Sequence, residues 1–499
     1  MNRRHFMQSS LSAAVAASIP ATNGVAALLG PSATVSADID AATGDGQEIT
    51  LARASVQELA DSLRGSLLLP GHAAYEDARH VINASIDRYP ALIVQPKGVS
   101  DIRSAVDFAR ESQLLTAVKC GGHSHSGKST CNGGMMIDLT THRYVHVDPQ
   151  RKIAQVAGGS LLGDMDHEAM SFGLVTTAGT VSHTGVGGLT LGGGFGRLAR
   201  RFGLSMDNVR AYELVTADGK FRRASPDENP DLYWGLRGGG GNFGVVTNFE
   251  FALHEMNREV IGGTIGFPLS EARQVLNFYA DYALEVPDEV GLEMVMFGSN
   301  PENSLIMLAV CYSGPHSEVE PILKRIRSTG TVIVDDVRAM DYVALQRSGD
   351  LSDPRGVGSY TKSGFLSELS PDFIDAVVNH FEARQGRNTV FATQHAGGAI
   401  SRVAPDATAF PHRGINFIPL LIIDWPIDSD AHEHVAWLKE TWRTFEPHLE
   451  GFYTNDLIDE SQEEVDRNYM GNYGRLVALK NRYDPGNLFR LNANVRPTI

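Results

Sequence analysis

The sequence has few of the features that mark nucleic-acid-binding, membrane-spanning or disulfide-rich proteins. Its formal net charge is −16, and beyond the N-terminus basic residues gather only over 197–201, which argues against a nucleic-acid partner. The apolar run 415–423 is interrupted by Asn416 and Pro419 and is far shorter than the roughly 20 residues that span a bilayer. Three cysteines allow at most one disulfide within the chain, so we expect no disulfide framework. From the charge and the short apolar run we expect no nucleic-acid partner and no membrane span.

The first residues are typical of an export signal. Arg3 and Arg4 precede an Ala- and Ser-rich apolar stretch over 9–30 and the small-residue site Val35-Ser36-Ala37. This order predicts a twin-arginine leader over residues 1–37, although a basic, unstructured N-terminus has a similar composition. We expect export by the twin-arginine machinery to the periplasm or the medium.

Glycine, by contrast, is abundant and concentrated. The segment 174–209 holds seven glycines within twelve positions, namely Gly185, Gly187, Gly188, Gly192, Gly193, Gly194 and Gly196, and two more glycine-rich loops occupy 119–127 and 236–246. Glycine is entropically unfavourable in folded structure unless another backbone or a ligand approaches closely. Three such loops, separated by strand-like segments, predict one elongated cofactor, which we interpret as FAD.

The remaining pattern predicts an α+β fold with two domains. Short strands and helices alternate up to about residue 255, including a helix over 55–69, a helix beginning at Ser100 as its N-cap, and a hairpin through a type I′ turn at 217–219. After 256 the glycine runs stop, and longer strands alternate with helices. We predict a cofactor domain over 38–255, a substrate domain over 256–455 and a C-terminal segment, 456–499, that returns to the first domain.

Two other cofactor sites are less consistent with the spacing. A Rossmann fingerprint needs G-x-G-x-x-G between a strand and a helix, whereas Gly239–Gly244 leads into a strand-like run. His123 and His125 have H-x-H spacing, which can begin a metal site, but no further ligand is tied to them by spacing. Solvated loop histidines are the simpler alternative, so we predict no metal.

Five motifs in order resemble the flavoprotein oxidases of the berberine bridge enzyme type, whose FAD domain is shared with vanillyl-alcohol oxidase. They are GGHSHSG at 121–127, AGTVSHTGVGGLTLGGGFG at 178–196, DNV at 207–209, LRGGGGNFGVVT at 236–247 and RLVALKNRYDPGNLFR at 475–490. The resemblance implies a two-subdomain FAD-binding domain of the PCMH type and a substrate domain with an antiparallel sheet flanked by helices.

The resemblance also implies how FAD is held. The histidine bonded to the flavin 8α-methyl corresponds to His123, while the cysteine that forms a second bond in many members is replaced by Val181, so one covalent link is expected. The further cofactor-binding residues that the motifs imply are Cys120, Gly121, Gly122, Ser124, Gly127, Gly179, Thr180, Gly185, Gly187, Gly188, Gly192, Gly193, Asp207, Asn208, Gly244, Val246 and Asn455.

The resemblance further suggests the catalytic groups. Tyr453 and Asn455 match a Y-x-N segment whose tyrosine is the base in several members, which requires a pKa below its usual value near 10. Packing on the flavin ring is the alternative role for Tyr453. Thr184 corresponds to the position that faces the oxygen-reactive carbon, and Gln394 and His395 are candidates for the substrate side, with His395 the next candidate base.

Together these features predict an FAD-dependent oxidase. It would take a hydride from an alcohol-type substrate, a sugar or a secondary alcohol, and reduce O₂ to hydrogen peroxide. A dehydrogenase, a ring-closing oxidase of a natural product and a non-catalytic flavin-bearing protein are the alternatives, and the last is disfavoured because Tyr453 and Asn455 are both present.

Overall fold

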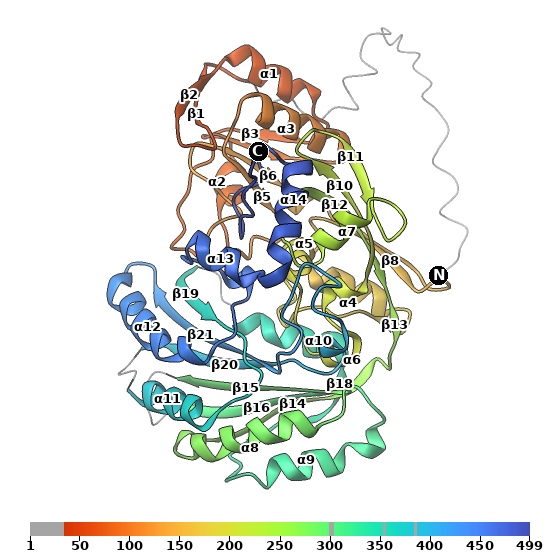
Figure 1. Ribbon diagram of the computed structural model, residues 1–499, viewed down its shortest axis with the longest axis vertical. Coiled ribbons are helices and arrows are strands. Elements are labelled where there is room, and N and C mark those ends of the chain that lie inside the picture. Colours follow the sequence, from red (N-terminus) through yellow and green to blue (C-terminus); the bar gives the residue numbers. More distant parts are fainter. Residues whose placement is uncertain (1–33, 299–303, 353–355, 384–386) are drawn as a thin grey trace, which may run out of the picture.

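The computed structural model describes residues 34–298, 304–352, 356–383 and 387–499. A four-stranded and a five-stranded sheet lie in the upper half of Figure 1, and an eight-stranded sheet lies in the lower half. This architecture confirms the predicted α+β class. Residues 1–33 of the predicted leader lie outside the described residues, and Val35 packs into the core. No helix in the described ranges is long and apolar enough to cross a membrane.

The four-stranded sheet is built from the first part of the described chain. Its order is β3 (Ser66–Leu68), β4 (Leu92–Gln95), β6 (Met135–Asp138) and β5 (Thr116–Lys119), with β4 and β5 parallel to β6. Helices α1 (Arg53–Ser62) and α3 (Val99–Glu111) contribute to the core of this layer. The predicted helix over 55–69 is therefore wrong in its second half, because the chain becomes extended at Leu63 and then pairs with β4.

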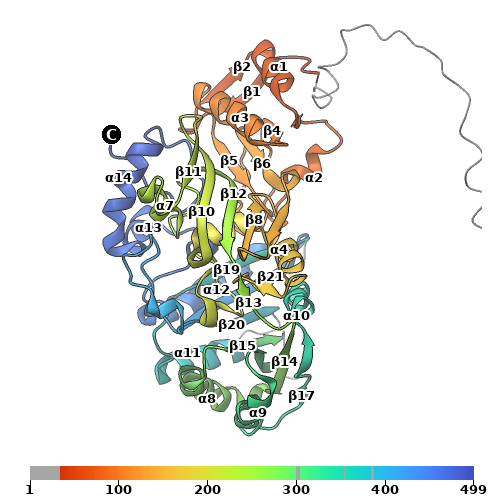
Figure 2. The same cartoon turned by 90° about the vertical axis from the view of Figure 1, so that its right-hand side faces the viewer.

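The five-stranded sheet is entirely antiparallel and lies beside the first one (Figure 2). Its order is β11 (Phe221–Ala224), β10 (Val209–Thr216), β12 (Gly244–Ala252), β8 (Ile153–Ala157) and β7 (Val145–Asp148). Buried side chains of α4 (Leu162–Met170), α7 (Pro230–Leu236) and the C-terminal helices join those of the sheet in one core.

Two local predictions in this half are corrected. Gly98, not Ser100, is the N-cap of α3, since the helix begins two residues earlier than that cap predicts. The β10–β11 hairpin forms as predicted, but Gly219 is the only residue of its turn with positive φ, at +72°. A type I′ turn needs positive φ at both central residues. Instead, the Gly219 N–H donates to the Thr216 carbonyl at 2.9 Å and the loop has three residues.

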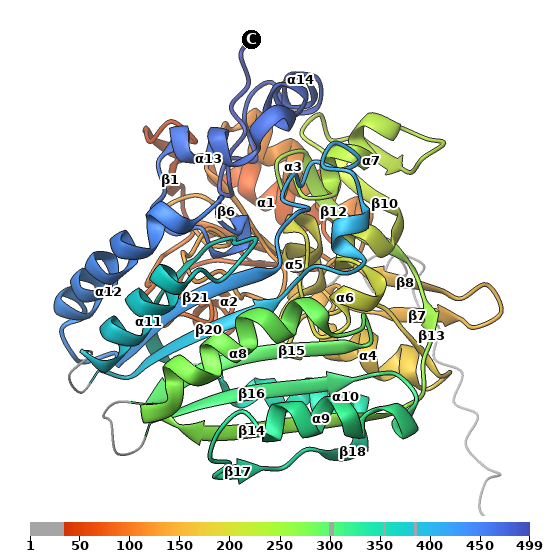
Figure 3. The ribbon, with the colours of Figure 1, turned by 60° about the horizontal axis from the view of Figure 1, so that its bottom comes forward.

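The eight-stranded antiparallel sheet dominates the second half. The main path runs β17 (Val334–Asp335), β14 (Glu259–Pro268), β16 (Leu305–Tyr312), β15 (Val290–Gly298), β20 (Thr389–His395), β21 (Phe417–Pro426) and β19 (Val357–Ser363), with β18 (Arg338–Asp341) also paired to β14. Helices α8 (Ala272–Glu285), α11 (Pro371–Glu382) and α12 (Ala431–Phe445) cover one face (Figure 3). The other face is turned toward the first half, so that a Cβ atom at Gly291 would lie 2.6 Å from the Arg197 carbonyl oxygen.

The C-terminal segment returns to the upper half of the molecule, as the blue helices α13 (Gln462–Asn468) and α14 (Tyr473–Tyr483) show in Figure 1. Lys480 and Asp484 form a fully buried ion pair at 2.7 Å. Lys480 Nζ also donates to the carbonyl oxygens of Asn242 and Phe489, both at 2.9 Å. A buried charge is tolerated only when it is paired and hydrogen-bonded in this way. The ion pair thus holds the chain end against the third glycine-rich loop.

Shorter elements complete the fold. They are β1 (Ile39–Ala42), β2 (Glu48–Leu51), α2 (Tyr75–Arg79), β9 (Leu174–Val175), α5 (Val186–Gly192), α6 (Ala199–Phe202), β13 (His254–Glu255), α9 (Glu320–Arg327) and α10 (Tyr342–Ser348).

Candidate active site

Two of the three glycine-rich loops touch through their backbones. A Cβ atom at Gly121 would lie 2.4 Å from the Gly185 nitrogen, and one at Gly185 would lie 2.3 Å from the Gly121 nitrogen. Neither position can carry a side chain without separating the loops. Cys120 lies at the same junction, where its thiol donates to the Gly158 carbonyl at 2.8 Å and burial raises its pKa. Cys120, like the two other cysteines, is a free thiol.

The contact between the loops brings His123 against two residues of the central segment. His123 Nε2 lies 2.7 Å from His183 Nδ1, and His123 Nδ1 lies 3.3 Å from Thr184 Oγ1. Sequence spacing did not link His183 to His123, because 60 residues separate them in the chain. The two predicted site residues His123 and Thr184 therefore lie together. Among the described residues, no group of three or more metal-ligating side chains occurs.

The third glycine-rich loop joins the same segment from the other end. The N–H groups of Gly238 and Gly240 both donate to the Leu191 carbonyl at 3.0 Å. Beside this loop lies the C-terminal segment, with Asn492 Nδ2 at 3.9 Å from a Cβ position on Gly241. The side-chain oxygens of Asn492 and Asn494 are buried and have no hydrogen-bond partner among the described residues. Sequence reasoning missed both asparagines, although their N-x-N spacing directly after the last motif was a usable signal.

Tyr453 and Asn455 lie on the glycines at the end of α5. The Tyr453 hydroxyl accepts hydrogen bonds from the Gly194 N–H at 3.0 Å and from Asn455 Nδ2 at 2.7 Å. Asn455 Nδ2 also donates to the Leu189 carbonyl at 3.2 Å. Gly192 leaves room for this amide, since a Cβ atom there would lie 2.2 Å from Asn455 Oδ1. Both predicted catalytic residues thus contact the segment that also carries Thr184.

The surroundings of Tyr453 raise its pKa, whereas a catalytic base needs a lowered one. Burial, reinforced by the nearby Asp456 carboxylate, raises the pKa of Tyr453, whereas the two hydrogen bonds to its oxygen act in the opposite direction and are outweighed. Without a bound ligand the phenol is therefore protonated, and the lowered pKa required of a base is not present. Asp456 is another residue that sequence reasoning missed, and burial raises the pKa of its carboxyl as well.

The two residues predicted for the substrate side separate. His395 is buried on the helix-covered face of the large sheet, where Leu292 N–H donates to Nδ1 at 3.2 Å and Nε2 donates to the Ala283 carbonyl at 2.9 Å. Burial also lowers the pKa of His395 well below its ordinary value. His395 is thus a structural core residue and not a substrate ligand or a base. Gln394, its neighbour on β20, points to the opposite face because side chains alternate along a strand.

That opposite face borders a cavity of about 310 Å³ between the two halves of the molecule. Arg197 enters it from the first half, and Glu293 and Asp336 enter it from the large sheet. Arg197 is held by Gln346 Oε1 at 2.8 Å, and burial raises the pKa of the Glu293 carboxyl. Side chains alternate between the two faces of β15. Glu293 could have been predicted to face this cavity if the sequence had shown which face of the sheet the helices cover.

Asp207 and Asn208, predicted to bind the cofactor, both have hydrogen-bond partners within the protein. Asp207 receives two hydrogen bonds from the guanidinium of Arg413 at 2.8 and 2.9 Å. Asn208 donates to the carbonyl oxygens of Phe202 and Leu204. Because Arg413 comes from the second half of the chain, the bidentate pair fastens the loop before β21 to the segment that follows the central glycines.

The other predicted cofactor residues divide between loop contacts and strand pairing. Gly127 N–H donates to the Ser124 carbonyl at 3.0 Å, and the Thr180 carbonyl accepts from Arg197 at 3.3 Å. Gly244 and Val246 belong to the β10–β12 ladder. The remaining positions, Gly122, Gly179, Gly187, Gly188 and Gly193, lie in or beside the touching loops and α5.

Comparison with known proteins agrees with this geometry. Residues 90–225 match the family described as FAD binding domain, and residues 453–496 match the family described as berberine and berberine like. The chain is 32% identical over 447 residues to an FAD-linked oxidoreductase of Dictyostelium discoideum, an alignment that covers 89% of this chain and 97% of the relative. The chain belongs to the berberine bridge enzyme-like family of FAD-linked oxidoreductases.

Other relatives match over a similar share of the chain. The (R)-6-hydroxynicotine oxidase of Paenarthrobacter nicotinovorans is 30% identical, with 87% of this chain and 97% of the relative covered. Among solved structures, a xylooligosaccharide oxidase from Myceliophthora thermophila superposes with a TM-score of 0.79 at 25% identity, covering 89% of this chain and all of that one. The chain is accordingly an enzyme that uses FAD.

The residues present fit an FAD group. The backbone of Gly188 faces open space, with no atom within 4 Å of a Cβ position, and the side-chain oxygens of Asn492 and Asn494 lack partners. Glycine backbones accept a close planar ligand, and buried acceptors without partners call for a donor from outside the protein. The touching loops and the C-terminal asparagines are therefore the groups that would hold the cofactor.

The Arg413–Asp207 pair generates a stability prediction. Replacing Arg413 with methionine would leave the Asp207 carboxylate, with 11% of its side chain exposed, without a counter-charge. We expect a loss of about 3–5 kcal/mol in the free energy of unfolding, measured by denaturant titration. Arg402→Met is the matched control, because Arg402 pairs with Asp288 at the surface and such pairs contribute about 0–1 kcal/mol. Equal losses in the two variants would contradict the role of the Arg413 pair.

Proposed function

We propose that this enzyme is an oxidase of small hydroxyl-bearing substrates, with FAD attached covalently through His123. The supporting observation is that one glycine segment contacts His123 through Thr184 at its start and Tyr453 through Gly194 at its end. When bound, FAD accepts a hydride from a substrate carbon and passes the electrons to O₂ as hydrogen peroxide. The chain's own residues supply attachment, orientation and proton transfer around that step.

Three charged side chains in the cavity between the two halves support a hydroxyl-bearing substrate. Arg197, Glu293 and Asp336 line it, and charged side chains recognise hydroxyl groups through strong hydrogen bonds. Relatives named for their substrates include a xylooligosaccharide oxidase and a hydroxynicotine oxidase. We therefore favour a sugar or another alcohol. A flavin-dependent dehydrogenase or a ring-closing oxidase of a natural product is the second candidate.

Tyr453 is proposed to take the proton of the substrate hydroxyl. Its oxygen accepts two hydrogen bonds from Gly194 and Asn455, and these are the contacts that would stabilise a phenolate. Burial opposes ionisation, so proton transfer requires that the bound substrate and cofactor shift this balance.

Export through the twin-arginine machinery, with the protein acting in the periplasm or outside the cell, is also proposed. It rests on Arg3, Arg4 and the apolar stretch that follows them. A covalent link would suit this route, because no free FAD is expected to be available for rebinding after export.

The proposed oxidase activity is tested by a substrate panel. Purified protein is expected to release hydrogen peroxide with at least one member of a set of mono- and oligosaccharides, secondary alcohols and hydroxylated aromatic amines. Each substrate is measured in parallel with a dye acceptor under nitrogen. Turnover with the dye but no peroxide in air would make the enzyme a dehydrogenase. If no substrate of the panel reduces the flavin, the proposal is contradicted.

The role of Tyr453 predicts two separable effects. Tyr453→Phe is expected to slow flavin reduction by about 10²-fold or more in anaerobic stopped-flow, with flavin content unchanged. Asn455→Ala removes a hydrogen bond that lowers the Tyr453 pKa, so the rising limb of the pH–rate profile is expected to move to higher pH. Thr454→Val leaves both hydrogen bonds intact and serves as control. Near-normal reduction by Tyr453→Phe would transfer the base role to Asp456.

Thr184 is proposed to keep the space beside the flavin open to oxygen. Thr184→Leu, which adds bulk, is expected to slow reoxidation of the reduced enzyme by O₂ while its reduction by substrate stays close to normal. Thr184→Val removes only the hydroxyl that lies 3.3 Å from His123 and is the matched control, with fast reoxidation expected. Equal reoxidation rates in the leucine variant and the wild type would refute this role.

A further inference from the structure

The cavity between the two halves contains an arginine whose orientation is fixed by the protein. Arg197 Nη1 donates to Gln346 Oε1 at 2.8 Å and to the Thr180 carbonyl at 3.3 Å. Gln346 is itself only 1% exposed, and its Nε2 donates to the Gly179 carbonyl at 2.9 Å. The guanidinium is therefore held against the loop before α5, where it lines the cavity.

The other donors of Arg197 are not used within the protein. Among the described residues, Nη1 is the only atom of this guanidinium that forms a hydrogen bond, and the side chain has no ion pair. Nε and Nη2 make up an edge of the guanidinium that binds a carboxylate through two parallel hydrogen bonds. An oriented arginine with this edge open is suited to an acidic ligand.

The charged groups around the arginine do not cancel its charge. Burial raises the pKa of the Glu293 carboxyl, which favours its neutral form. Asp336 and Arg338 line the exposed side of the cavity with opposite charges. Asp166 accepts a hydrogen bond from Gln346 Nε2 at 3.3 Å, and burial raises its pKa to about 7. An anion entering the cavity would therefore meet a positive inner wall.

A row of side chains crosses the large sheet from this cavity toward Tyr453. By the register of β15 and β20, Glu293 and Gln394 are neighbours on the face toward the first half. Gln394 pairs with Ile418 on β21, and Ile418 packs in the same cluster as Tyr453. Gln394 is half-buried, and its amide forms no hydrogen bond with the described residues. This amide is thus a polar contact between the cavity and the proposed base.

The row also gives a length for the ligand. Neighbouring strands lie about 4.8 Å apart, so the two steps from Glu293 to Ile418 cover roughly 10 Å. A substrate with its acid group at Arg197 and its reacting hydroxyl at Tyr453 must span a comparable distance. That distance is longer than one sugar ring.

We propose that Arg197 binds a carboxylate of the substrate, and that the enzyme acts on acidic disaccharides or longer acidic sugars. This inference deepens the oxidase activity proposed above and rests on it. Arg197 determines specificity by contact with the acid group, and the Gln394 amide bonds to a hydroxyl in the middle of the substrate. The reacting hydroxyl lies at Tyr453, and the bonds that break are unchanged.

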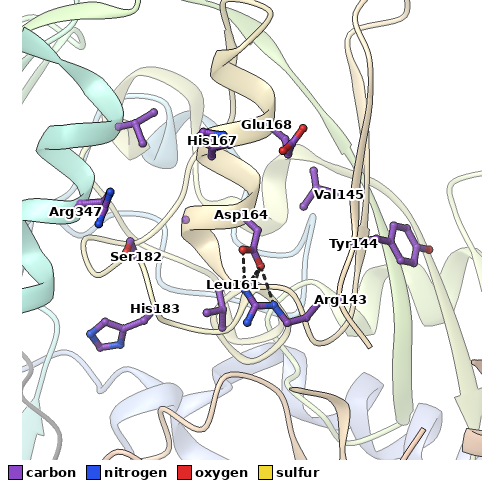
Figure 4. Close-up of a pocket in the computed structure, with 12 residues that line it drawn as sticks. Arg143, Tyr144, Val145, Leu161, Asp164, His167, Glu168, Ser182, His183 and Arg347 are labelled. Carbon is purple, nitrogen blue, oxygen red and sulfur yellow. Dashed lines mark hydrogen bonds and ion pairs between the residues drawn. The ribbon is translucent and has the colours of Figure 1, made fainter. Parts of the chain in front are cut away.

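The larger cavity on α10 is less suited to an acid group. It has a volume of about 510 Å³, and Figure 4 shows that its Arg143 already faces Asp164. The two side chains form hydrogen bonds at 2.7 Å, so the edge of this guanidinium is occupied. Arg347, on the same cavity, is exposed, and no hydrogen bond with the described residues orients it. Only Arg197 is both oriented and open.

The test compares matched sugars that differ in one charge. Cellobiose, cellobiouronate and the methyl ester of cellobiouronate form one set, and the corresponding galactose disaccharides form a second. Reduction of the flavin in the full-length enzyme is followed by anaerobic stopped-flow. For wild type, half-saturation is expected at about 10- to 100-fold lower concentration with the acid than with the ester or the neutral sugar, as for a charged hydrogen-bonded pair. Glucuronate and glucose, which are shorter, are expected to differ less.

Three variants assign the preference to the arginine. Arg197→Gln is expected to remove the difference between acid and neutral sugar, while the saturating rate of reduction stays close to that of wild type. Arg197→Lys keeps the charge and a donor for Gln346 but lacks the planar fork, so an intermediate preference is expected. Arg443→Gln, on the exposed side of α12, is the control and should keep the wild-type preference.

The outcomes separate this inference from the proposed function. Equal half-saturation with acid, ester and neutral sugar in wild type would overturn the role of Arg197 and leave the oxidase activity intact. An equal loss for acidic and neutral sugars in Arg197→Gln would show a purely structural role and would also overturn it. A glucuronate preference as large as that for cellobiouronate would refute the inferred length. Reduction by no substrate, charged or neutral, would contradict the proposed function itself.

Discussion

The contact between the backbones of Gly121 and Gly185 determines the geometry of the whole site. With either Cβ present, the two loops would be forced apart, because the nearest backbone nitrogens lie at 2.3–2.4 Å from those positions. Separation of the loops would remove His123 from both His183 and Thr184. Glycine is required here by the approach of protein to protein, and the cofactor site is formed around that approach.

Buried charged groups then fasten distant parts of the chain around the junction. Lys480 and Asp484 hold the C-terminal segment to the third glycine-rich loop, and Arg413 and Asp207 hold the second half to the first. Arg413 donates two hydrogen bonds to Asp207 and one to Thr408, and Lys480 donates to Asp484 and to two carbonyl oxygens, so both buried charges are paired and hydrogen-bonded.

Local sequence patterns predicted much of this arrangement. The motif order identified the family, and the glycine density indicated which segments meet. What failed depended on tertiary information. His395 reads as a site residue from its neighbours in sequence, but strand alternation buries it under α8, beside Ala283. The pairing of Asp207 with Arg413, 206 residues later in the chain, likewise has no local sequence signal. The positions of His183 and Asp456 beside the site depend on neighbours that only folding supplies.

The position of the chain end has a consequence for biosynthesis. Asn242, in the third glycine-rich loop, receives the Lys480 ammonium and the Val495 N–H, contacts that span 238 and 253 residues of sequence. Contacts of such separation form late, since long loops must close before they add stability. During synthesis the third glycine-rich loop can therefore acquire these contacts only after the residues around 480–495 have left the ribosome.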